Sequence, residues 1–503
     1  MTEFGETIAK AYASEGAAVE LGKGMLDGQI DADAAVRMPL AMLNRHGLIA
    51  GATGTGKTVT LQMISEQLSK AGVPVFVADM KGDLSGLSAA GAADGPAPKR
   101  SAELGVEYAP TACSVEFLSL GGIGPGVPVR ATVSDFGPQL LAKILGSNDT
   151  QEQSLSLVFR YADEKGLPLL DLSDLRTLLA YLESDQGKAE LTGLGGVSKA
   201  TVGVLLRALA MLEDGGGNEL FGEPQFAITD LLRVGPDGRG IISSLELPAV
   251  QDKPRLFSTA LMWMLAELFE ELPEVGDLEK PKLVFFFDEA HLLFDGATKA
   301  FLESVTQTVR MIRSKGVGIF FVTQMPKDIP PDVLGQLGNR IQHALRAFTP
   351  EDAKALKATA STFPTSPYYK VEELLTGLGI GEAAVTILSE SGVPTPLVQT
   401  RLRAPQSRMG AVDDVDAKAK ASPRYASYAT RVDNQSAREM LAARLDPPAK
   451  PKVKPKKPAP QHKKAASATG GLDALGGFLN SRQGKQIQRQ VTRGVFDMLK
   501  KQL

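Results

Sequence analysis

The chain has 503 residues, of which 43% are hydrophobic and 22% charged, and this composition is typical of a soluble, globular protein with a large core. Its length predicts one large domain with insertions, or two domains. The formal net charge of -3 and the pI of about 6.0 exclude a basic field over the whole surface, so any contact with DNA must be local.

The compartment is indicated by what the sequence lacks. Cys113 is the single cysteine, which excludes a disulfide framework within the chain and suits a reducing compartment. The start, "MTEFGETIAKAYASEG", has no apolar run of signal-peptide length, and no later segment approaches the roughly 18 apolar residues that span a bilayer. We therefore expect a cytoplasmic protein without membrane contact.

The first strong motif is a glycine-rich turn between a predicted strand and a predicted helix. "GLIAG" begins at residue 47 and has strand length, and the apolar spacing of "TVTLQMISEQLSK" predicts a helix. The intervening "GATGTGKT", residues 51–58, fits the phosphate-binding pattern GxxxxGK[ST] at every fixed position. Backbone N–H groups of such a loop surround a polyphosphate, while Lys57 reaches the β- and γ-phosphates and Thr58 ligates Mg²⁺. The residues predicted to bind the nucleotide are Gly51, Ala52, Thr53, Gly54, Thr55, Gly56, Lys57, Thr58 and Val59.

The next segments in chain order predict further strands and a helical insertion. "VPVFVADMKGD" (73–83) is an apolar run that ends in acids, and Asp79 and Asp83 either face the metal region or open a loop. The glycine cluster 121–126 precedes a strand rather than a helix, so it is a poor dinucleotide fingerprint. Residues 138–235 have mainly helical spacing and read as an insertion, after which a strand at 239–247 and a helix at 255–271 return to the core.

A second apolar strand supplies the acids that a phosphate loop needs. In "PKLVFFFDEAH" (281–291), the run "LVFFF" predicts a strand buried on both faces, and Asp288 and Glu289 follow its carboxyl end, where ligands meet parallel sheets. We expect Asp288 to hold Mg²⁺ through water and Glu289 to be the general base. The alternative is a charged helix cap. His291 is more plausibly structural than catalytic, and the four histidines show no metal-ligand spacing.

A third strand is predicted at "VGIFFVTQ" (317–324). If this strand lies between the phosphate loop and the acid strand, Gln324 can contact both the γ-phosphate and the attacking water. The alternative is a polar strand end at the surface.

The composition changes after residue 400. We expect a core at 1–400, a linker at 401–471 that is Lys/Pro-rich and disordered from about 446, and an amphipathic basic helix at 472–503. The basic tether either binds DNA non-specifically or is a solvated spacer. The final helix docks on the core, binds a protein partner or touches nucleic acid.

These motifs together resemble a known family. "RHGLIAGATGTGKT", "FFFDEAHLLF", "RSKGVGIFFVTQ" and "GQLGNRIQHALRAFTPED" are similar to the ATPase core of the HerA–FtsK superfamily of hexameric DNA translocases, and most similar to bacterial proteins with a helicase HerA-like C-terminal domain. The similarity covers about residues 18–400. It implies a RecA-like α/β P-loop fold and a ring. Only about 45 residues precede the phosphate loop, so we expect the N-terminal β-barrel of HerA, and the partner contacts assigned to it, to be missing.

The resemblance also implies two arginines that act between subunits. By position, Arg313 matches the family's arginine finger, which neutralises charge on the phosphoryl group bound by a neighbour, and Arg45 matches a second interface arginine. Without the resemblance both read as ordinary surface charge. The reserve candidates are Arg310, Arg340 and Arg346.

The function that we expect is Mg²⁺-dependent ATP hydrolysis by a homo-oligomer, most plausibly a hexamer, coupled to DNA translocation or unwinding. The alternative is an ATP-driven switch that remodels a protein partner without DNA. A two-lobed DEAH helicase is disfavoured because residues 400–503 are too short for a second lobe. A kinase is disfavoured because no arginine-rich lid follows and Glu289 is suited to activating water.

Overall fold

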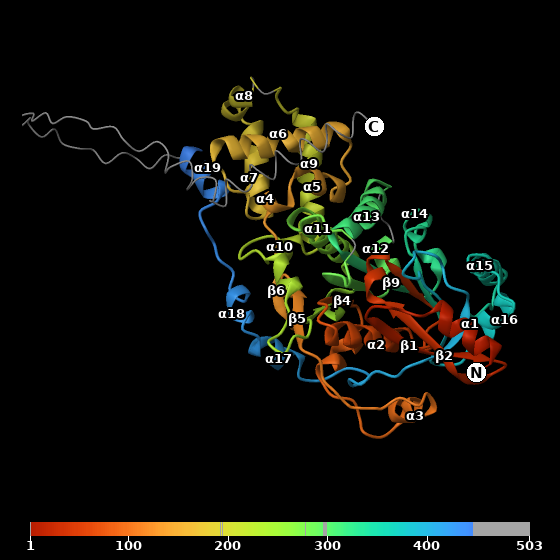
Figure 1. Cartoon of the computed structure of the whole chain (residues 1–503). Coiled ribbons are helices and arrows are strands. Elements are labelled where there is room, and N and C mark those ends of the chain that lie inside the picture. The colour runs from red at the N-terminus through yellow and green to blue at the C-terminus, as the bar shows by residue number, and fades with distance from the viewer. Residues whose placement is uncertain (1, 192, 194, 277, 295–298, 446–503) are drawn as a thin grey trace, which may run out of the picture. The chain divides into compact units, whose positions relative to one another are not determined.

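The computed structural model describes residues 2–191, 193, 195–276, 278–294 and 299–445. Within these residues twelve strands form one sheet in the order β2-β1-β12-β11-β10-β3-β9-β8-β4-β7-β5-β6 (Figure 1). The strands are β1 Ala18–Leu26, β2 Gln29–Pro39, β3 Gly47–Ala50, β4 Val75–Asp79, β5 Val115–Leu120, β6 Val127–Val129, β7 Ile242–Glu246, β8 Leu283–Phe287, β9 Val317–Thr323, β10 Asn339–Gln342, β11 Glu382–Thr386 and β12 Val398–Leu402.

The sheet has a parallel and an antiparallel part. The run from β10 to β6 is parallel at every pairing, whereas β2, β1, β12 and β11 extend it with antiparallel pairs. The predicted mainly parallel α/β fold is therefore confirmed. The strand predicted at 317–324 is β9, and it lies between the strand that precedes the phosphate loop and the strand that precedes the acids, since β9 pairs with β3 on one side and with β8 on the other.

The central strands are buried on both faces, as the run "LVFFF" predicts. Every residue of β8 is buried, and successive side chains alternate between two cores. Phe285 and Phe287 belong to the core that contains the insertion helices, and Phe286 belongs to the core shared with α1 and α2. This alternation follows from the two-residue period of a strand. The core on each face fixes the register of the strand ends that carry the acids.

Helices cover the sheet and fill the connections between strands (Figure 1). They are α1 Glu3–Ala11, α2 Lys57–Lys70, α3 Pro96–Glu103, α4 Val133–Phe136, α5 Pro138–Ile144, α6 Asp149–Lys165, α7 Leu172–Glu183, α8 Asp185–Leu191, α9 Lys199–Asp214, α10 Gly217–Leu220, α11 Pro254–Glu271, α12 His291–Phe294, α13 Lys299–Ile312, α14 Pro331–Leu334, α15 Pro350–Ala360, α16 Val371–Gly377, α17 Val415–Ala421, α18 Tyr425–Tyr428 and α19 Ala437–Leu445. None of the described helices has the length and apolar character needed to cross a membrane.

The segment predicted as a helical insertion, 138–235, contains α5 to α10. Figure 1 shows α5 to α9 gathered at one end of this part of the chain, next to α11. Capping boxes begin two of these helices, at Asn148 for α6 and at Asp171 for α7, and satisfy N–H groups that a helix start leaves without partners.

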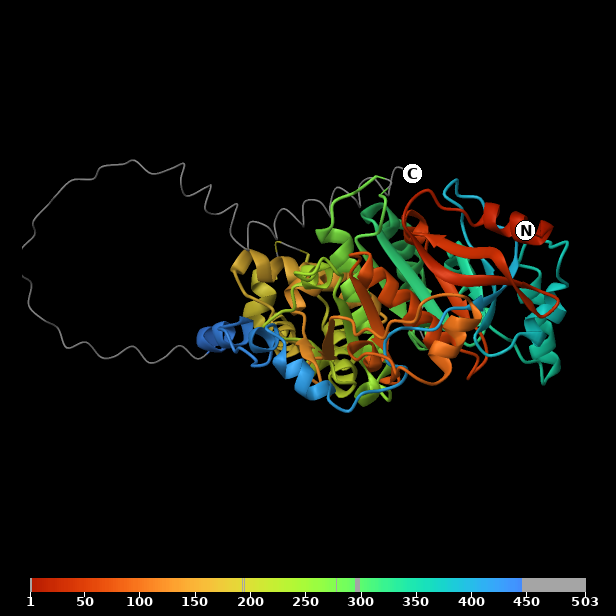
Figure 2. The same cartoon turned by 60° about the horizontal axis from the view of Figure 1, so that its bottom comes forward.

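Residues 401–445 differ from the linker that the sequence predicts, because they are packed against the core (Figures 1 and 2). The side chain of Arg424 forms an ion pair with Asp230 at 2.8 Å, and the buried Tyr428 donates to the same carboxylate at 2.9 Å. The buried Leu441 of α19 belongs to the core that contains α7. These few contacts are spread over a polar segment, so periodicity gave no sign of them. The predicted tether from 446 and the helix at 472–503 lie outside the described residues.

Candidate functional site

The glycine-rich loop joins β3 to α2 and has the backbone shape that a phosphate loop requires. Gly51 has φ +152°, and a Cβ built on it would lie 2.5 Å from the Cβ of His343, so no larger residue fits. Gly56 precedes α2 with φ +112° and gives the helix no side-chain cap. The first N–H groups of α2 are therefore left without the partner that a capping side chain supplies, and with the helix dipole they form a site for an anion.

Lys57 begins α2 and lies over this loop. Its Nζ donates to the carbonyl oxygens of Gly51 at 2.7 Å and Ala52 at 3.3 Å, and its side chain is buried. Burial lowers the pKa of Lys57, and the negative charges of Glu289 and Asp288 oppose that shift. The lysine of the loop and the two acids therefore share one electrostatic environment.

The two acids follow β8 directly. Asp288 is 2% exposed, and no hydrogen-bond partner of its Oδ2 atom is found in the described part of the chain. Burial, together with the neighbouring charge of Glu289, raises the pKa of Asp288 to about 7. A buried carboxylate oxygen without a donor is costly in a protein that binds nothing there, and is suited to a cation or to its water shell.

Glu289 has the left-handed backbone angle φ +47°, which is uncommon outside glycine and re-aims the chain at the strand end. Its Oε1 accepts from Lys81 Nζ at 2.5 Å, and its Oε2 lies 3.4 Å from His291 Nδ1. The backbone N–H of Ala290 donates to Val322 of β9 at 2.8 Å, which holds the acids beside that strand.

For Asp79 and Asp83 the sequence left two interpretations, that they face the metal region or that they open a loop. The structure has features of both. Asp79 ends β4 and accepts from the backbone N–H groups of Lys81, Gly82 and Leu84 at 2.7 to 3.1 Å, so it shapes the loop. One carboxylate oxygen from each of Asp79, Asp83 and Asp288 also lies within 4.8 Å of the others. Burial raises the pKa of Asp79 to about 6. The loop after β4 therefore adds two carboxyl groups to the region of Asp288.

Gln324 follows β9, between the loop and the acids. The N–H of Gly51 donates to the carbonyl oxygen of Thr323 at 3.2 Å, so the end of β9 touches the phosphate loop. The neighbouring Val322 contacts the acid loop through Ala290. The Gln324 side chain is exposed at this edge of the sheet. Gln324 therefore lies at the strand end between the phosphate loop and the acids.

Arg45 and Arg313 are not brought to this site. Arg45 precedes β3 and Arg313 precedes β9, so both lie at the amino ends of parallel strands, whereas the loop and the acids lie at the carboxyl ends. Of the reserve arginines, Arg346 follows β10 and lies at the same edge as the loop, because the N–H of Ala52 donates to Ala344 at 2.8 Å. Arg310 is on α13 and Arg340 is within β10.

Sequence reasoning missed two charged residues of the site, Lys81 and Glu246. Lys81 stands in "DMKGD", between two acids already singled out, and that spacing was a usable signal. Glu246 ends β7 beside Asp79 in the strand register. Burial, then the charge of Asp79, raises the pKa of Glu246 to about 8. An acid inside the predicted strand "RGIISSLEL" was the only local signal for it.

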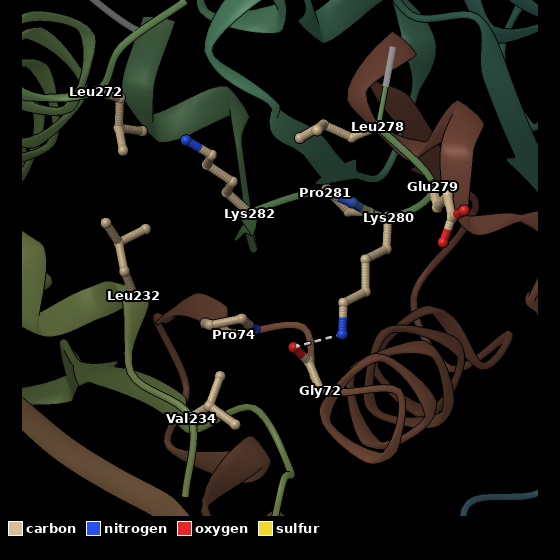
Figure 3. Close-up of a pocket in the computed structure, with 10 residues that line it drawn as sticks. All are labelled: Gly72, Pro74, Leu232, Val234, Leu272, Leu278, Glu279, Lys280, Pro281 and Lys282. Carbon is tan, nitrogen blue, oxygen red and sulfur yellow. Dashed lines mark hydrogen bonds between the residues drawn. The ribbon is translucent and has the colours of Figure 1, made fainter. Parts of the chain in front are cut away.

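A separate cavity of about 600 Å³ lies away from these residues (Figure 3). It is lined by Gly72, Pro74, Leu232, Val234, Leu272, Leu278, Glu279, Lys280, Pro281 and Lys282. Pro74 and Lys282 directly precede β4 and β8, so the cavity is at the amino ends of these strands. Lys280 is already engaged there, since its Nζ donates to Gly72 at 3.4 Å and to Ala71 at 2.9 Å. This cavity is therefore not the phosphate site.

Comparison with known proteins gives matches at the level of sequence family and of fold. The family model described as "Helicase HerA-like C-terminal" matches residues 25–502. "Probable helicase MJECL08" of Methanocaldococcus jannaschii is 28% identical over 149 residues, which is 28% of this chain and 28% of that protein, so the match spans little more than a quarter of that relative.

Two of the similar solved structures are of one protein, TrwB. The bacterial conjugative coupling protein TrwBdeltaN70 matches with a TM-score of 0.52 and 16% identity, over 81% of this chain and 95% of that chain. The plasmid coupling protein TrwB in complex with ADP and Mg²⁺ matches with a TM-score of 0.52 and 15% identity, over 80% and 93%. At this identity the likeness shows the fold alone, and that fold is the RecA-like P-loop fold expected from the sequence.

Proposed function

This chain belongs to the helicase HerA-like C-terminal family, and on that premise we propose that it is a Mg²⁺-dependent ATPase that works as a ring, most plausibly a hexamer, and moves along or unwinds DNA. The observation that carries the ATPase proposal is the meeting, at one edge of the sheet, of the glycine-rich loop, Asp288 with Glu289, and Gln324. A relative of the same fold was solved with ADP and Mg²⁺, which supports this choice of ligands.

In this proposal the loop residues 51–59 hold the triphosphate. The free N–H groups at the start of α2 donate to phosphate oxygens, and Lys57 exchanges its carbonyl contacts with Gly51 and Ala52 for the β- and γ-phosphates. The partly buried Thr58 and the buried Asp288, whose Oδ2 lacks a donor, fit a Mg²⁺ ion. When bound, that ion would neutralise charge that develops on the phosphate oxygens.

Glu289 and Gln324 act on the attacking water. Glu289 takes a proton from the water as its oxygen bonds to the γ-phosphorus, and the bond to the bridging oxygen of ADP breaks, which releases ADP and inorganic phosphate. Gln324 orients the water and contacts the γ-phosphate. In the described part of the chain the buried Oε2 atom of Glu289 has no hydrogen-bond partner, and His291 Nδ1 lies 3.4 Å from it; an oxygen without a donor supports the role of Glu289 as acceptor.

Arg313 acts on the site of a neighbouring subunit, and Arg45 supports the same interface. Both lie at the strand edge opposite the loop of their own chain, and this supports action between subunits rather than within one. Arg313 is exposed, as a residue that reaches a neighbour must be. A guanidinium placed against the transferring phosphoryl group neutralises its charge in the transition state.

Mixing two inactive variants tests this assignment. In a mixed ring, the Arg313→Ala chain still has Glu289 and the Glu289→Gln chain still has Arg313. An interface in which the first supplies Glu289 and the second supplies Arg313 therefore contains both catalytic groups. We expect an equal mixture to recover up to about a quarter of the wild-type ATPase rate. The matched control mixes Arg313→Ala with the double variant Arg313→Ala/Glu289→Gln, which rebuilds no site. Equal rates in the two mixtures would show that Arg313 does not act in trans.

DNA dependence tests the motor part of the proposal. We expect double-stranded DNA to raise the ATPase rate of the wild-type chain several-fold at low salt, and the stimulation to fall as salt rises, because phosphate contacts release counterions. The basic tether 446–471 is proposed to contribute to this contact. Unchanged ATPase rates, together with no DNA binding at low salt, would remove DNA translocation from the proposal.

The second candidate function is a switch that remodels a protein partner, and the pI of about 6.0 favours it because the chain has no basic field over its whole surface. The helix at 472–503 would then bind the partner. A protein captured by Glu289→Gln with ATP, but not with ADP, and unaffected by DNA would support this second function over the first.

A further inference from the structure

Lys81 is a charged residue of the site that the mechanism above does not use. It lies in the loop between β4 and the 3-10 helix Asp83–Ser88, and its own backbone N–H donates to Asp79 Oδ1 at 3.1 Å. The same carboxylate holds Gly82 and Leu84. The root of the Lys81 side chain is therefore fixed, while the side chain itself is 47% exposed and has room to move.

The side chain of Lys81 ends on the proposed general base. Its Nζ lies 2.5 Å from Glu289 Oε1, and the Glu289 side chain is only 8% exposed. An ammonium that donates to this oxygen occupies the position from which a water would donate its proton. In the nucleotide-free chain Lys81 therefore restrains the group on which hydrolysis depends.

A bound triphosphate competes for the same ammonium. The charge of Lys81 acts on the pKa of Lys57, as do the charges of Glu289 and Asp288, so Lys81 lies within electrostatic reach of the lysine that grips the phosphates. ADP lacks the γ-phosphate, whose oxygens carry the negative charge nearest to the acids in the proposed geometry. Only ATP then offers Lys81 a new anionic partner beside Glu289.

We propose that Lys81 is a positioning residue that pairs with Glu289 when no γ-phosphate is present and transfers to the γ-phosphate when ATP binds. The transfer leaves Glu289 as a free carboxylate beside the attacking water. Hydrolysis and loss of phosphate return Lys81 to Glu289. This inference rests on the proposed function, because it assigns the nucleotide to the loop 51–58 and the base to Glu289.

The first test measures nucleotide affinity in the full chain. Lys81→Met is expected to weaken binding of the slowly hydrolysed analogue ATPγS by about tenfold, and to leave ADP affinity unchanged, because only the contact with the γ-phosphate is lost. Lys81→Arg keeps the charge and should restore most of the preference for ATPγS. Lys70→Met, at the exposed end of α2, is the matched control. Equal losses for the two nucleotides, or no loss at all, would overturn the proposal.

The second test follows the Lys81 amine itself by its rate of acylation, measured by mass spectrometry in Glu289→Gln. With ADP this variant lacks the ion pair between Lys81 and Glu289, and only the charges of Asp288 and Asp83 still act on Lys81, so labelling should be faster than in the wild-type chain. ATPγS should slow it again, by about fivefold or more, as the amine pairs with the γ-phosphate. Labelling that ATPγS does not slow would overturn the transfer step.

Neither measurement depends on turnover. If the wild-type chain bound nucleotide but never hydrolysed it, the proposed ATPase function would fail while both tests of Lys81 still gave an answer. If hydrolysis were normal and Lys81 showed no γ-phosphate dependence, only the inference about Lys81 would fail.

Discussion

Replacing Glu289 by glutamine is expected to lower the turnover number for ATP by about 10²- to 10⁴-fold while nucleotide still binds, because the amide keeps the shape of the side chain and cannot accept a proton. The backbone at this position has φ +47°, so the conservative change also avoids new strain in the loop after β8. In the proposed site the loop residues 51–59 hold the triphosphate, and Glu289 does not contribute to that binding.

The measurement is a steady-state ATPase assay paired with equilibrium binding of a fluorescent ATP analogue. Glu303→Gln provides a matched control, since Glu303 is an exposed glutamate on α13 that forms a 3.8 Å surface ion pair with Lys299. The control should hydrolyse ATP at the wild-type rate. Normal turnover by Glu289→Gln would show that another acid of the site is the general base. Asp79, at the end of the neighbouring strand β4, would be the first acid to test.

The parts of the site that the sequence predicted are those that one short segment specifies by itself. The pattern "GATGTGKT" fixes a strand-to-helix turn by its glycines, and "LVFFFDE" fixes a buried strand with acids at its carboxyl end. In both cases the local sequence decides the backbone. The strands, the turn and the helix α2 are present in the structure with boundaries within a few residues of the expected ones.

Residues whose roles depend on strand order were open at the sequence level. Gln324 reaches the site only because β9 pairs with both β3 and β8, and no local pattern encodes that order. Asp79 reaches Asp288 because β4 pairs with β8. The same pairing brings Lys81 to Glu289, a contact across 208 positions of sequence. Such contacts are set by how both faces of the sheet are packed, and a single sequence does not reveal them.

The contacts that residues 401–445 make with the core could not be predicted from the sequence, for a related reason. The anchors of this segment are single contacts, such as the ion pair from Arg424 to Asp230 and the buried side chain of Leu441, separated by polar stretches. In such a segment the apolar residues do not recur at helical or strand spacing over enough positions to predict an element. The conformation of residues 401–445 depends on contacts with other parts of the chain, such as Asp230 and the core around α7.

Replacing Lys57 by alanine is expected to reduce kcat/KM for ATP by about 10²- to 10³-fold, because the variant loses the positive charge aimed at the β- and γ-phosphates while the rest of the loop remains. The fold should tolerate the change. Burial lowers the pKa of Lys57, which means that its ammonium is held at an electrostatic cost, and alanine relieves that cost while the carbonyl oxygens of Gly51 and Ala52 lose a donor.

Because these two effects on stability oppose each other, the unfolding temperature of nucleotide-free Lys57→Ala should stay within about 2 °C of the wild type. Addition of ATP should raise it for the wild-type chain but not for Lys57→Ala, since a ligand stabilises the state that binds it. Lys70→Ala removes a lysine from the exposed end of the same helix and should match the wild type in both assays. Since a loss of activity with intact folding cannot come from a collapsed loop, this pattern would assign the phosphates to Lys57. Undiminished hydrolysis by Lys57→Ala would instead mean that the triphosphate binds elsewhere, and the roles given to Asp288, Glu289 and Gln324 would fall with it.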